Sequence, residues 1–225
     1  MLVGPFVGLC TVLGIATVSA TVVRAAPIVY DFRTPAAAAA LDGTMHGTLT
    51  VDGRPLDVRA GRTTAAGLFT FGSDTLSIDA SEGLGVNDTQ IRDVIGMSDL
   101  FTAVRFAPDP QVVVRGITVR RFFDSEDLRV FVDGALLGDC ILGVVCDFAT
   151  TIVDAATGEV EIGFGALAGI SNLMVTTVTA LSDDSDYFVA ALRAHAIPEP
   201  SGLALALAGL IAMAATGAVT RLRVR

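Results

Sequence analysis

The sequence predicts an all-β protein, an antiparallel β-sandwich of jelly-roll-like kind. Short runs rich in Val, Leu, Phe and Thr recur between residues 28 and 195, separated by turns that contain Gly, Asp or Pro. Residues 112–119 alternate between two faces, and Asp133-Gly134 is a dipeptide typical of a hairpin turn. This spacing favours a sandwich over parallel βαβ units, and we expect about nine to twelve strands.

The elements can be assigned in chain order. The first expected strand is Ile28 to Phe32. A short helix follows, with Thr34 as its cap, Pro35 in its first turn, five alanines and an end at Asp42-Gly43. An alanine-rich loop is the alternative for this stretch. The other expected strands are 46–51, 67–72, 75–80, 101–106, 112–119 extended towards 123, 128–132, 148–153, 160–164, 172–180 and 187–195.

Composition separates the middle of the chain, residues 26–197, from two apolar ends. This middle is long enough for one domain with its own core. It has 23 Asp or Glu against 11 Arg and no Lys, a net charge of about −12. Such an acidic surface repels phosphates and argues against nucleic acid as a partner. It suits an exported protein and leaves carboxylates for calcium.

Residues 1–25 are predicted to be a secretory signal peptide that forms a helix. Met1 to Val23 contains no charged side chain, and small residues gather at Ala20 and at Ala25. We expect cleavage after Ala25, with Ala20 as the alternative site. The basic residue that usually precedes such a run is missing, and Arg24 follows the run instead. An uncleaved N-terminal span is therefore the alternative.

The last segment, residues 198–225, combines three features. It begins Pro198-Glu199-Pro200, continues with an uncharged apolar run of about 18 residues, and ends with alternating arginines. A run of this length is about the shortest that spans a bilayer, so we predict a transmembrane helix at about residues 202–220. The prolines keep the preceding tripeptide out of the helix. Positive charge that resists translocation, and so stops the helix on the cytoplasmic side, is supplied by Arg221, Arg223 and Arg225.

Tripeptide, span and arginines in this order resemble the PEP-CTERM sorting signal of Gram-negative bacterial surface proteins. The resemblance implies that an exosortase, a membrane-embedded cysteine protease, recognises Pro198, Glu199 and Pro200 and cuts near them. It also implies transient anchoring in the inner membrane and delivery to the cell surface or an exopolysaccharide matrix. An ordinary membrane anchor with a proline-rich neck is the alternative. Residues 83–86, 123–127 and 130–134 are similar, less specifically, to β-sandwich ectodomains common among such proteins.

Two groups of residues are candidates for covalent or metal chemistry. Cys140 and Cys146 flank a short apolar loop, and in an oxidising compartment they most simply form a disulfide, with two reduced buried cysteines as the alternative. Calcium takes carboxylate and carbonyl oxygens from loops. Its candidate ligands are Asn87, Asp88, Asp124, Glu126 and Asp127, followed by Asp183, Asp184 and Asp186. None of these has EF-hand spacing, and solvated turns without an ion are the alternative.

Catalysis finds little support in the sequence. His46 and His195 stand at opposite ends of the domain, and no nucleophile-elbow, zinc or phosphate-loop motif is present. We expect a non-catalytic exported surface or extracellular-matrix protein. The alternative function is a carbohydrate-binding module that acts on the producer's exopolysaccharide. Aromatic residues for that role are few, since the chain has no Trp and only Tyr30 and Tyr187 besides its phenylalanines. A hydrolase would need a carboxylate pair, and nothing singles one out.

Overall fold

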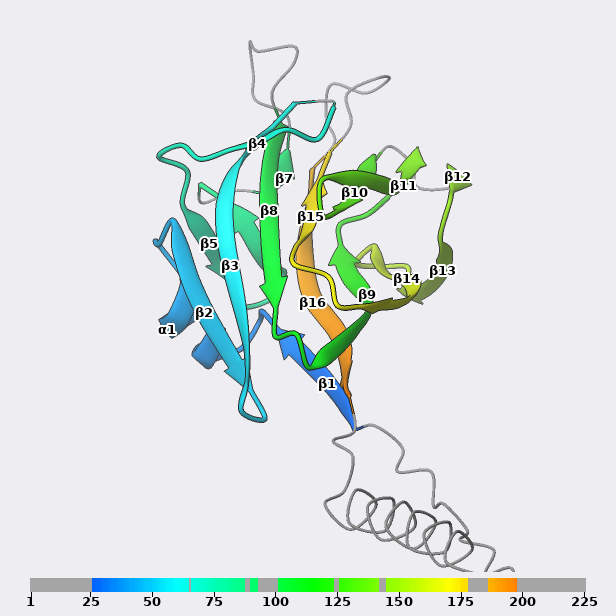
Figure 1. The fold of residues 1–225 in the computed structure, drawn as a ribbon. Helices are drawn as coiled ribbons and strands as arrows, with labels where there is room; N and C mark the ends of the chain where they lie inside the picture. Colours follow the sequence, from blue (N-terminus) through cyan, green and yellow to red (C-terminus); the bar gives the residue numbers. More distant parts are fainter. Residues whose placement is uncertain are drawn as a thin grey trace, which may run out of the picture.

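The computed structural model describes residues 26–64, 66–87, 90–92, 101–123, 126–141, 145–177 and 186–197. These residues form two antiparallel β-sheets and one short helix (Figure 1). The predicted signal peptide and the predicted transmembrane helix both lie outside the described ranges. Within those ranges, no helix has the length and apolar character needed to cross a membrane.

The first sheet, sheet A, is organised around β16 (Asp186–Ala196), its longest strand. The strand order is β13-β14-β9-β16-β6-β5, and β1 and β7 also pair with β16. One edge of β16 pairs with β9, and the other pairs in turn with β1, β6 and β7. The other strands are β1 (Pro27–Asp31), β5 (Leu76–Asp79), β6 (Gly83–Val86), β7 (Ile91–Arg92), β9 (Val112–Arg120), β13 (Ala149–Asp154) and β14 (Glu159–Ala168).

The second sheet, sheet B, has the strand order β12-β11-β10-β15-β8-β3-β2, and β4 also pairs with β3. Its strands are β2 (His46–Val51), β3 (Arg54–Thr63), β4 (Phe69–Thr70), β8 (Phe101–Pro108), β10 (Leu128–Val132), β11 (Ala135–Ile141), β12 (Val145–Cys146) and β15 (Leu173–Thr176). The prediction of an all-β protein with antiparallel strands is confirmed. The expected number of strands was too low, because the described residues contain sixteen. Three of these have only two residues, too few to show alternation.

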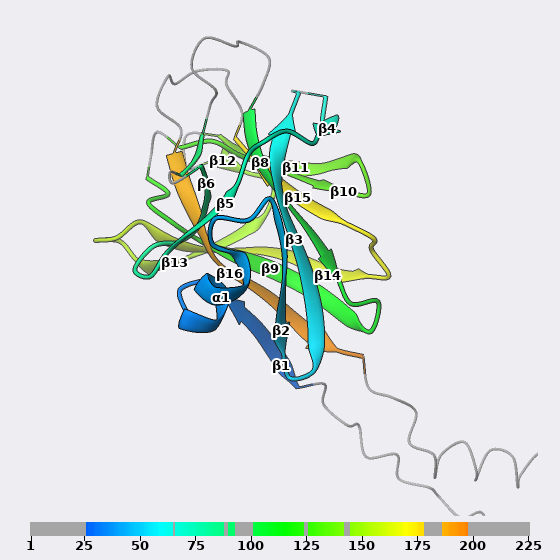
Figure 2. The ribbon, with the colours of Figure 1, turned by 90° about the vertical axis from the view of Figure 1, so that its left-hand side faces the viewer.

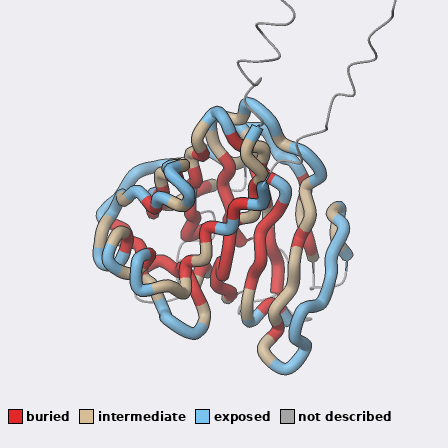
Figure 3. The backbone as a smooth tube through the Cα atoms, turned by 90° about the horizontal axis from the view of Figure 1, so that it is seen from below, coloured by how far each residue is buried: buried red, intermediate tan, exposed pale blue. Residues whose placement is uncertain are grey.

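The core lies between the two sheets. Inward-facing residues of both sheets belong to one buried cluster, which includes Ile117 and Leu192 of sheet A and Val58 and Phe106 of sheet B. The rings of Phe32 and Phe106 stack with their centres 5.7 Å apart, which joins the segment after β1 to β8. Figure 3 shows the buried positions gathered in the interior of the domain and the exposed positions around its outside. Burial of apolar surface between the layers is thus the main stabilising contribution.

Both tyrosines tie one sheet to the other. The hydroxyl of Tyr30 on β1 donates to the carbonyl oxygen of Arg54 on β3 at 3.3 Å, and that of Tyr187 on β16 donates to the carbonyl oxygen of Thr176 on β15 at 2.8 Å. Both side chains are fully buried. Neither tyrosine can therefore contact a glycan, which corrects the expectation that Tyr30 and Tyr187 are among the aromatic residues available for that role.

The short helix is α1 (Pro35–Leu41), as predicted. The Thr34 hydroxyl caps it by accepting a hydrogen bond from the Ala37 N–H at 3.2 Å. The helix packs against β2 and β5 at one side of the sandwich (Figure 2). Gly47 of β2 is needed there, since a Cβ at this position would collide with the carbonyl oxygen of Ala40.

The two ends of the domain lie side by side. Pro27 of β1 is the register partner of His195 on β16, and the N–H of Ala196 donates to the carbonyl oxygen of Ala26 at 3.3 Å. The N–H of Ile197 donates to the carbonyl oxygen of Gln111 at 2.8 Å. Both ends of the described domain therefore leave the sandwich at the same pole, at the bottom of Figure 1.

Candidate functional site

The outer face of sheet B, which points away from sheet A, carries a row of basic side chains. On β3, Val58 belongs to the core, so its neighbours Asp57 and Arg59 point outwards. Arg59 is the register partner of Arg105 on β8 and also of His46 on β2. Residues directly opposite on antiparallel strands share a face, with Cβ atoms about 5 Å apart. Arg59 therefore lies between two basic neighbours.

The segment around β4 crosses this face beside the row. Gly61 makes the crossing possible, because a Cβ there would collide with the ring of Phe69. Gly67 has a φ of +81°, and a side chain there would also collide with the ring of Phe131. The two glycines let the segment lie flat on the sheet. Phe69 then packs against a small outer cluster of Ala103, Phe131 and Met174.

Two aromatic rings lie over the arginine pair. The Cζ of Arg59 is 5.6 Å from the centre of the Phe71 ring, and the Cζ of Arg105 is 6.0 Å from the centre of the Phe69 ring. The two rings meet edge to face with centres 5.2 Å apart. Attraction between a guanidinium and a ring face contributes about 0.5–1 kcal/mol at exposed sites. Phe71 nevertheless remains 61% exposed, so much of its ring is open to a ligand.

A hollow of about 140 Å³ opens at the arginine pair and is lined by Asp57, Arg59, Arg105 and Ala107. Asp57 accepts a hydrogen bond from the hydroxyl of Thr48 at 2.5 Å. The hollow is smaller than the roughly 300–1,000 Å³ of pockets that enclose a small molecule. It suits one functional group of a larger ligand that lies along the face.

Arg59 and Arg105 differ from most arginines of the domain in their lack of a carboxylate partner. In the described part of the chain, no Asp or Glu oxygen comes within 4.0 Å of either guanidinium. Ion pairs are formed instead by Arg33, Arg54, Arg62, Arg120, Arg121, Arg129 and Arg193. In a chain of net charge −9, two neighbouring guanidinium groups thus remain available to an anion.

A second hollow, of about 270 Å³, lies on the outer face of sheet A near the chain ends. Its charged lining consists of Arg115, Glu161 and Arg193. Arg193 and Glu161 form an ion pair with each other, so this hollow offers less unbalanced charge than the face of sheet B. His195 also lines it, whereas His46 is exposed on the other sheet, so the two histidines do not meet.

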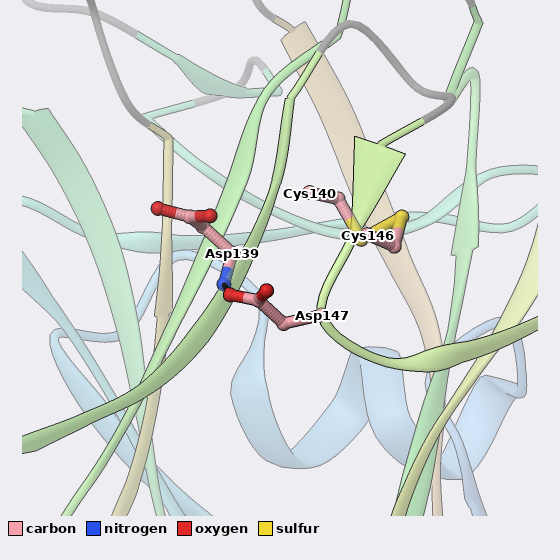
Figure 4. Close-up of a disulfide and its surroundings, with 4 residues drawn as sticks. All are labelled: Asp139, Cys140, Cys146 and Asp147. Atoms are coloured by element: carbon pink, nitrogen blue, oxygen red, sulfur yellow. Dashed lines mark hydrogen bonds between the residues drawn. A yellow bond between two sulfur atoms is a disulfide. The ribbon is translucent and has the colours of Figure 1, made fainter.

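The sequence-predicted sorting residues fall outside the described residues. This applies to Pro198, Glu199 and Pro200 and to Arg221, Arg223 and Arg225. The two predicted disulfide cysteines are described, and Cys140 and Cys146 are register partners on β11 and β12 with their sulfur atoms at bonding distance (Figure 4). A hydrogen bond also connects the residues next to the two cysteines, since the N–H of Asp139 donates to the Asp147 carboxylate at 3.1 Å.

The calcium candidates are only partly described. Asp88, Asp124, Asp183 and Asp184 lie outside the described ranges. Glu126 and Asp127 are buried, and the N–H of Asp186 donates to the Glu126 carboxylate, so two of the predicted clusters meet at the start of β16. No group of three His, Cys, Asp or Glu able to hold a metal occurs among the residues that the structure describes.

The side chain of Asn87, another calcium candidate, makes two hydrogen bonds within the domain. Its side-chain oxygen accepts from the N–H of Thr75 at 2.9 Å, and its amide nitrogen donates to Asp74 at 2.7 Å. Asp74 also accepts from Arg62 of β3 at 3.0 Å. Burial alone would raise the pKa of Asp74, but the hydrogen bonds from Arg62 and Asn87 outweigh it and hold this pKa below its usual value.

The arginine–aromatic face was not identified from the sequence. Asp57 and Arg59 belong to β3, a strand that was not predicted, and Arg105 was treated as one position of a predicted strand. The available signal was the alternation of Leu56 and Val58 with these charged residues.

Comparison of the chain with protein-family models, with curated proteins and with solved structures gives no match in any of the three. The site therefore has to be interpreted from its own chemistry.

Proposed function

We propose that this protein is exported, is anchored transiently in the inner membrane by its C-terminal helix, and is released to the cell surface or the extracellular matrix by an exosortase. The proposal rests on the tail sequence, in which Pro198-Glu199-Pro200 is followed by an apolar run and arginines. In this proposal, the jelly-roll-like sandwich is the part that is displayed.

The observation that supports the cleavage position is the place of Ile197, the last described residue after β16. Ile197 is held by a backbone hydrogen bond to Gln111, and Pro198 is the next residue. A cut within the tripeptide would therefore keep every described residue of the sandwich in the mature protein. The adjacent cysteines of β11 and β12 also suit an oxidising compartment outside the cytoplasm.

The test is mass spectrometry of both protein ends, in producer cells with and without the exosortase. We expect a new C-terminus near Pro200 in the first cells and an intact, membrane-bound chain in the second. Glu199→Gln should also block processing, whereas Asp52→Asn, in an exposed turn, should not. Unchanged processing of Glu199→Gln, or a mature protein that still ends at Arg225, would refute the proposal and favour an ordinary anchor.

A second function, glycan binding, is favoured by one observation on the outer face of sheet B. The Phe71 ring is largely exposed next to two arginines that have no carboxylate partner among the described residues. An aromatic face can pack against the C–H groups of a sugar ring, while charged and polar groups bind its substituents. A glycan array on the full chain tests this function. Binding to no glycan would exclude it.

A further inference from the structure

The arginine pair of sheet B places two positive charges next to each other. Arg59 and Arg105 are register partners, and like charges directly opposite on neighbouring strands destabilise a sheet. The domain has twice as many acidic residues as arginines, yet in the described residues neither of these arginines is neutralised. An arrangement of this kind becomes favourable when an anion binds between the two guanidinium groups.

The geometry restricts the chemistry of that anion. A guanidinium presents a planar fork of N–H donors that matches the two oxygens of a carboxylate. Cation–π contacts to Phe71 and Phe69 hold the two forks in place, which lowers the entropy lost when a ligand binds. Two adjacent forks on a flat sheet therefore suit a carboxylate carried by an extended ligand.

The surroundings of the pair suit a sugar as the carrier of that carboxylate. The exposed Phe71 ring forms an apolar wall beside Arg59. Asp57 lines the same hollow as Arg59 and Arg105, and its carboxylate can accept hydrogen bonds from hydroxyl groups. Because Asp57 lines the hollow, its carboxylate would repel a densely charged polyphosphate at short range. A glycan with one carboxylate per sugar has lower charge density and offers both hydroxyl groups and C–H faces.

We infer that the outer face of sheet B binds a uronate-containing glycan, with Arg59 and Arg105 holding a carboxylate and Phe71 packing against a sugar ring. This inference deepens the glycan-binding function proposed above and rests on it. It is independent of how the chain is sorted. At physiological salt, charges further away than about 8 Å are largely screened, so the local pair outweighs the net acidity of the domain.

The experiment measures binding of the full chain, kept in non-ionic detergent, to immobilised polygalacturonate by biolayer interferometry. Fully methyl-esterified polygalacturonate has the same sugar backbone without the charge, and dextran sulfate has charge without carboxylates. We expect binding to polygalacturonate, at least tenfold weaker binding to the methyl ester, and clearly weaker binding to dextran sulfate than to polygalacturonate. Equal or tighter binding to dextran sulfate would overturn the inference, because it would indicate non-specific attraction of anions.

Variants assign the site. Arg59→Gln with Arg105→Gln should weaken polygalacturonate binding at least tenfold, and Phe71→Ala severalfold. Arg115→Gln on sheet A is the matched control, an exposed arginine also without a carboxylate partner among the described residues, and it should leave affinity unchanged. Arg59→Lys keeps the charge, and a loss of affinity there would show that the planar fork matters. Thermal melting confirms that each variant is folded.

The possible failures are distinguishable. If the methyl ester binds as tightly as polygalacturonate, glycan binding stands and the uronate inference fails. If Arg115→Gln weakens binding as much as the double variant, the assignment of the binding site to the outer face of sheet B fails. If the chain binds neither polygalacturonate nor any other glycan, the inference and the glycan-binding function both fail, and the sorting proposal is unaffected.

Discussion

The hydroxyl of Tyr187 on β16 donates a hydrogen bond to the backbone carbonyl oxygen of Thr176 on β15, with 2.8 Å between the two oxygens. The two strands belong to different sheets, and both residues are buried. The Tyr187 ring also meets the ring of Phe122 edge to face, at 5.9 Å between centres. A polar bond thus links the two sheets inside an apolar layer, where an unmade hydrogen bond is expensive.

Removal of this hydroxyl should destabilise the domain. Tyr187→Phe keeps the ring and its packing but takes the donor away from the Thr176 carbonyl, so we expect the free energy of unfolding to fall by about 1–3 kcal/mol. Urea denaturation measures the loss. Tyr30→Phe is the comparison, because its bond to Arg54 is longer, 3.3 Å, and only partly buried, so its loss should be smaller. A larger loss for Tyr30→Phe would contradict the assignment.

The same two tyrosines predict instability in alkali. Burial, followed by the charge of Asp109, raises the pKa of Tyr30 to about 12, and burial holds the pKa of Tyr187 well above 10. In the unfolded chain both hydroxyls ionise near pH 10. Stability is therefore unaffected by them below pH 10 and falls as the pH rises from about 10 towards 12, because only the unfolded state loses protons.

Tyrosine absorbance can follow this transition directly, since the chain has two Tyr and no Trp. Tyrosinate absorbance should stay low in the folded protein at pH 10.5 or so and rise together with unfolding. The variant with both tyrosines changed to Phe should lose less stability between these pH values. Tyrosinate that forms at pH 10 in a protein that is still folded would show that the hydroxyls are not buried.

The buried carboxylate of Asp74 should make the domain less stable in acid, where the tyrosines have no effect. Its carboxylate, which is almost fully buried, accepts hydrogen bonds from Arg62 and Asn87, and its pKa is lowered. The stability that these bonds contribute is present above the unfolded-state pKa of about 4 and is lost as the pH falls below it. Asp74→Asn should lower the free energy of unfolding by about 1–3 kcal/mol at neutral pH. It should also make the free energy of unfolding depend less steeply on pH below about 4. Asn87→Ala removes one of the bonds and should cost less. If the free energy of unfolding of Asp74→Asn fell as steeply with decreasing pH as that of the wild type, the role of Asp74 would be refuted.

The sequence was sufficient where a local pattern decides the structure. Alternation in residues 112–119 gave β9, and Asp133-Gly134 forms the expected turn with φ of 50° and 83°. Asp52-Gly53 carries the same signal and has the same geometry, φ of 51° and 73°. It joins β2 to β3, yet β3 was missed because Arg54, Pro55 and Asp57 gave the stretch the composition of a loop.

The candidate site could not be predicted because it depends on register. Arg59 and Arg105 lie far apart in the chain, and a shift of one residue between β3 and β8 would put one of them in the core. The burial of Tyr30 and Tyr187 likewise depends on strands that pack from the opposite sheet. Patterns within one strand show which residues share a face. Which strand faces them is set by long-range packing.

The cysteine pair gives a prediction about redox state. Cys140 and Cys146 are register partners with Cα atoms 4.0 Å apart, and the backbone N–H of Asp147 donates to the Asp139 carbonyl oxygen at 2.9 Å beside them. Closing a loop this short in the unfolded chain is worth about 2 kcal/mol by the loop-entropy estimate. Reduction should therefore lower the melting temperature, and the variant with Cys140→Ser and Cys146→Ser should melt at the reduced temperature whether or not reductant is added. Alkylation of the denatured, unreduced protein followed by peptide mass spectrometry checks the state of both thiols. Labelled Cys140 or Cys146 in protein isolated from outside the cell would show that the bond is not formed there, and would remove one argument for an oxidising destination.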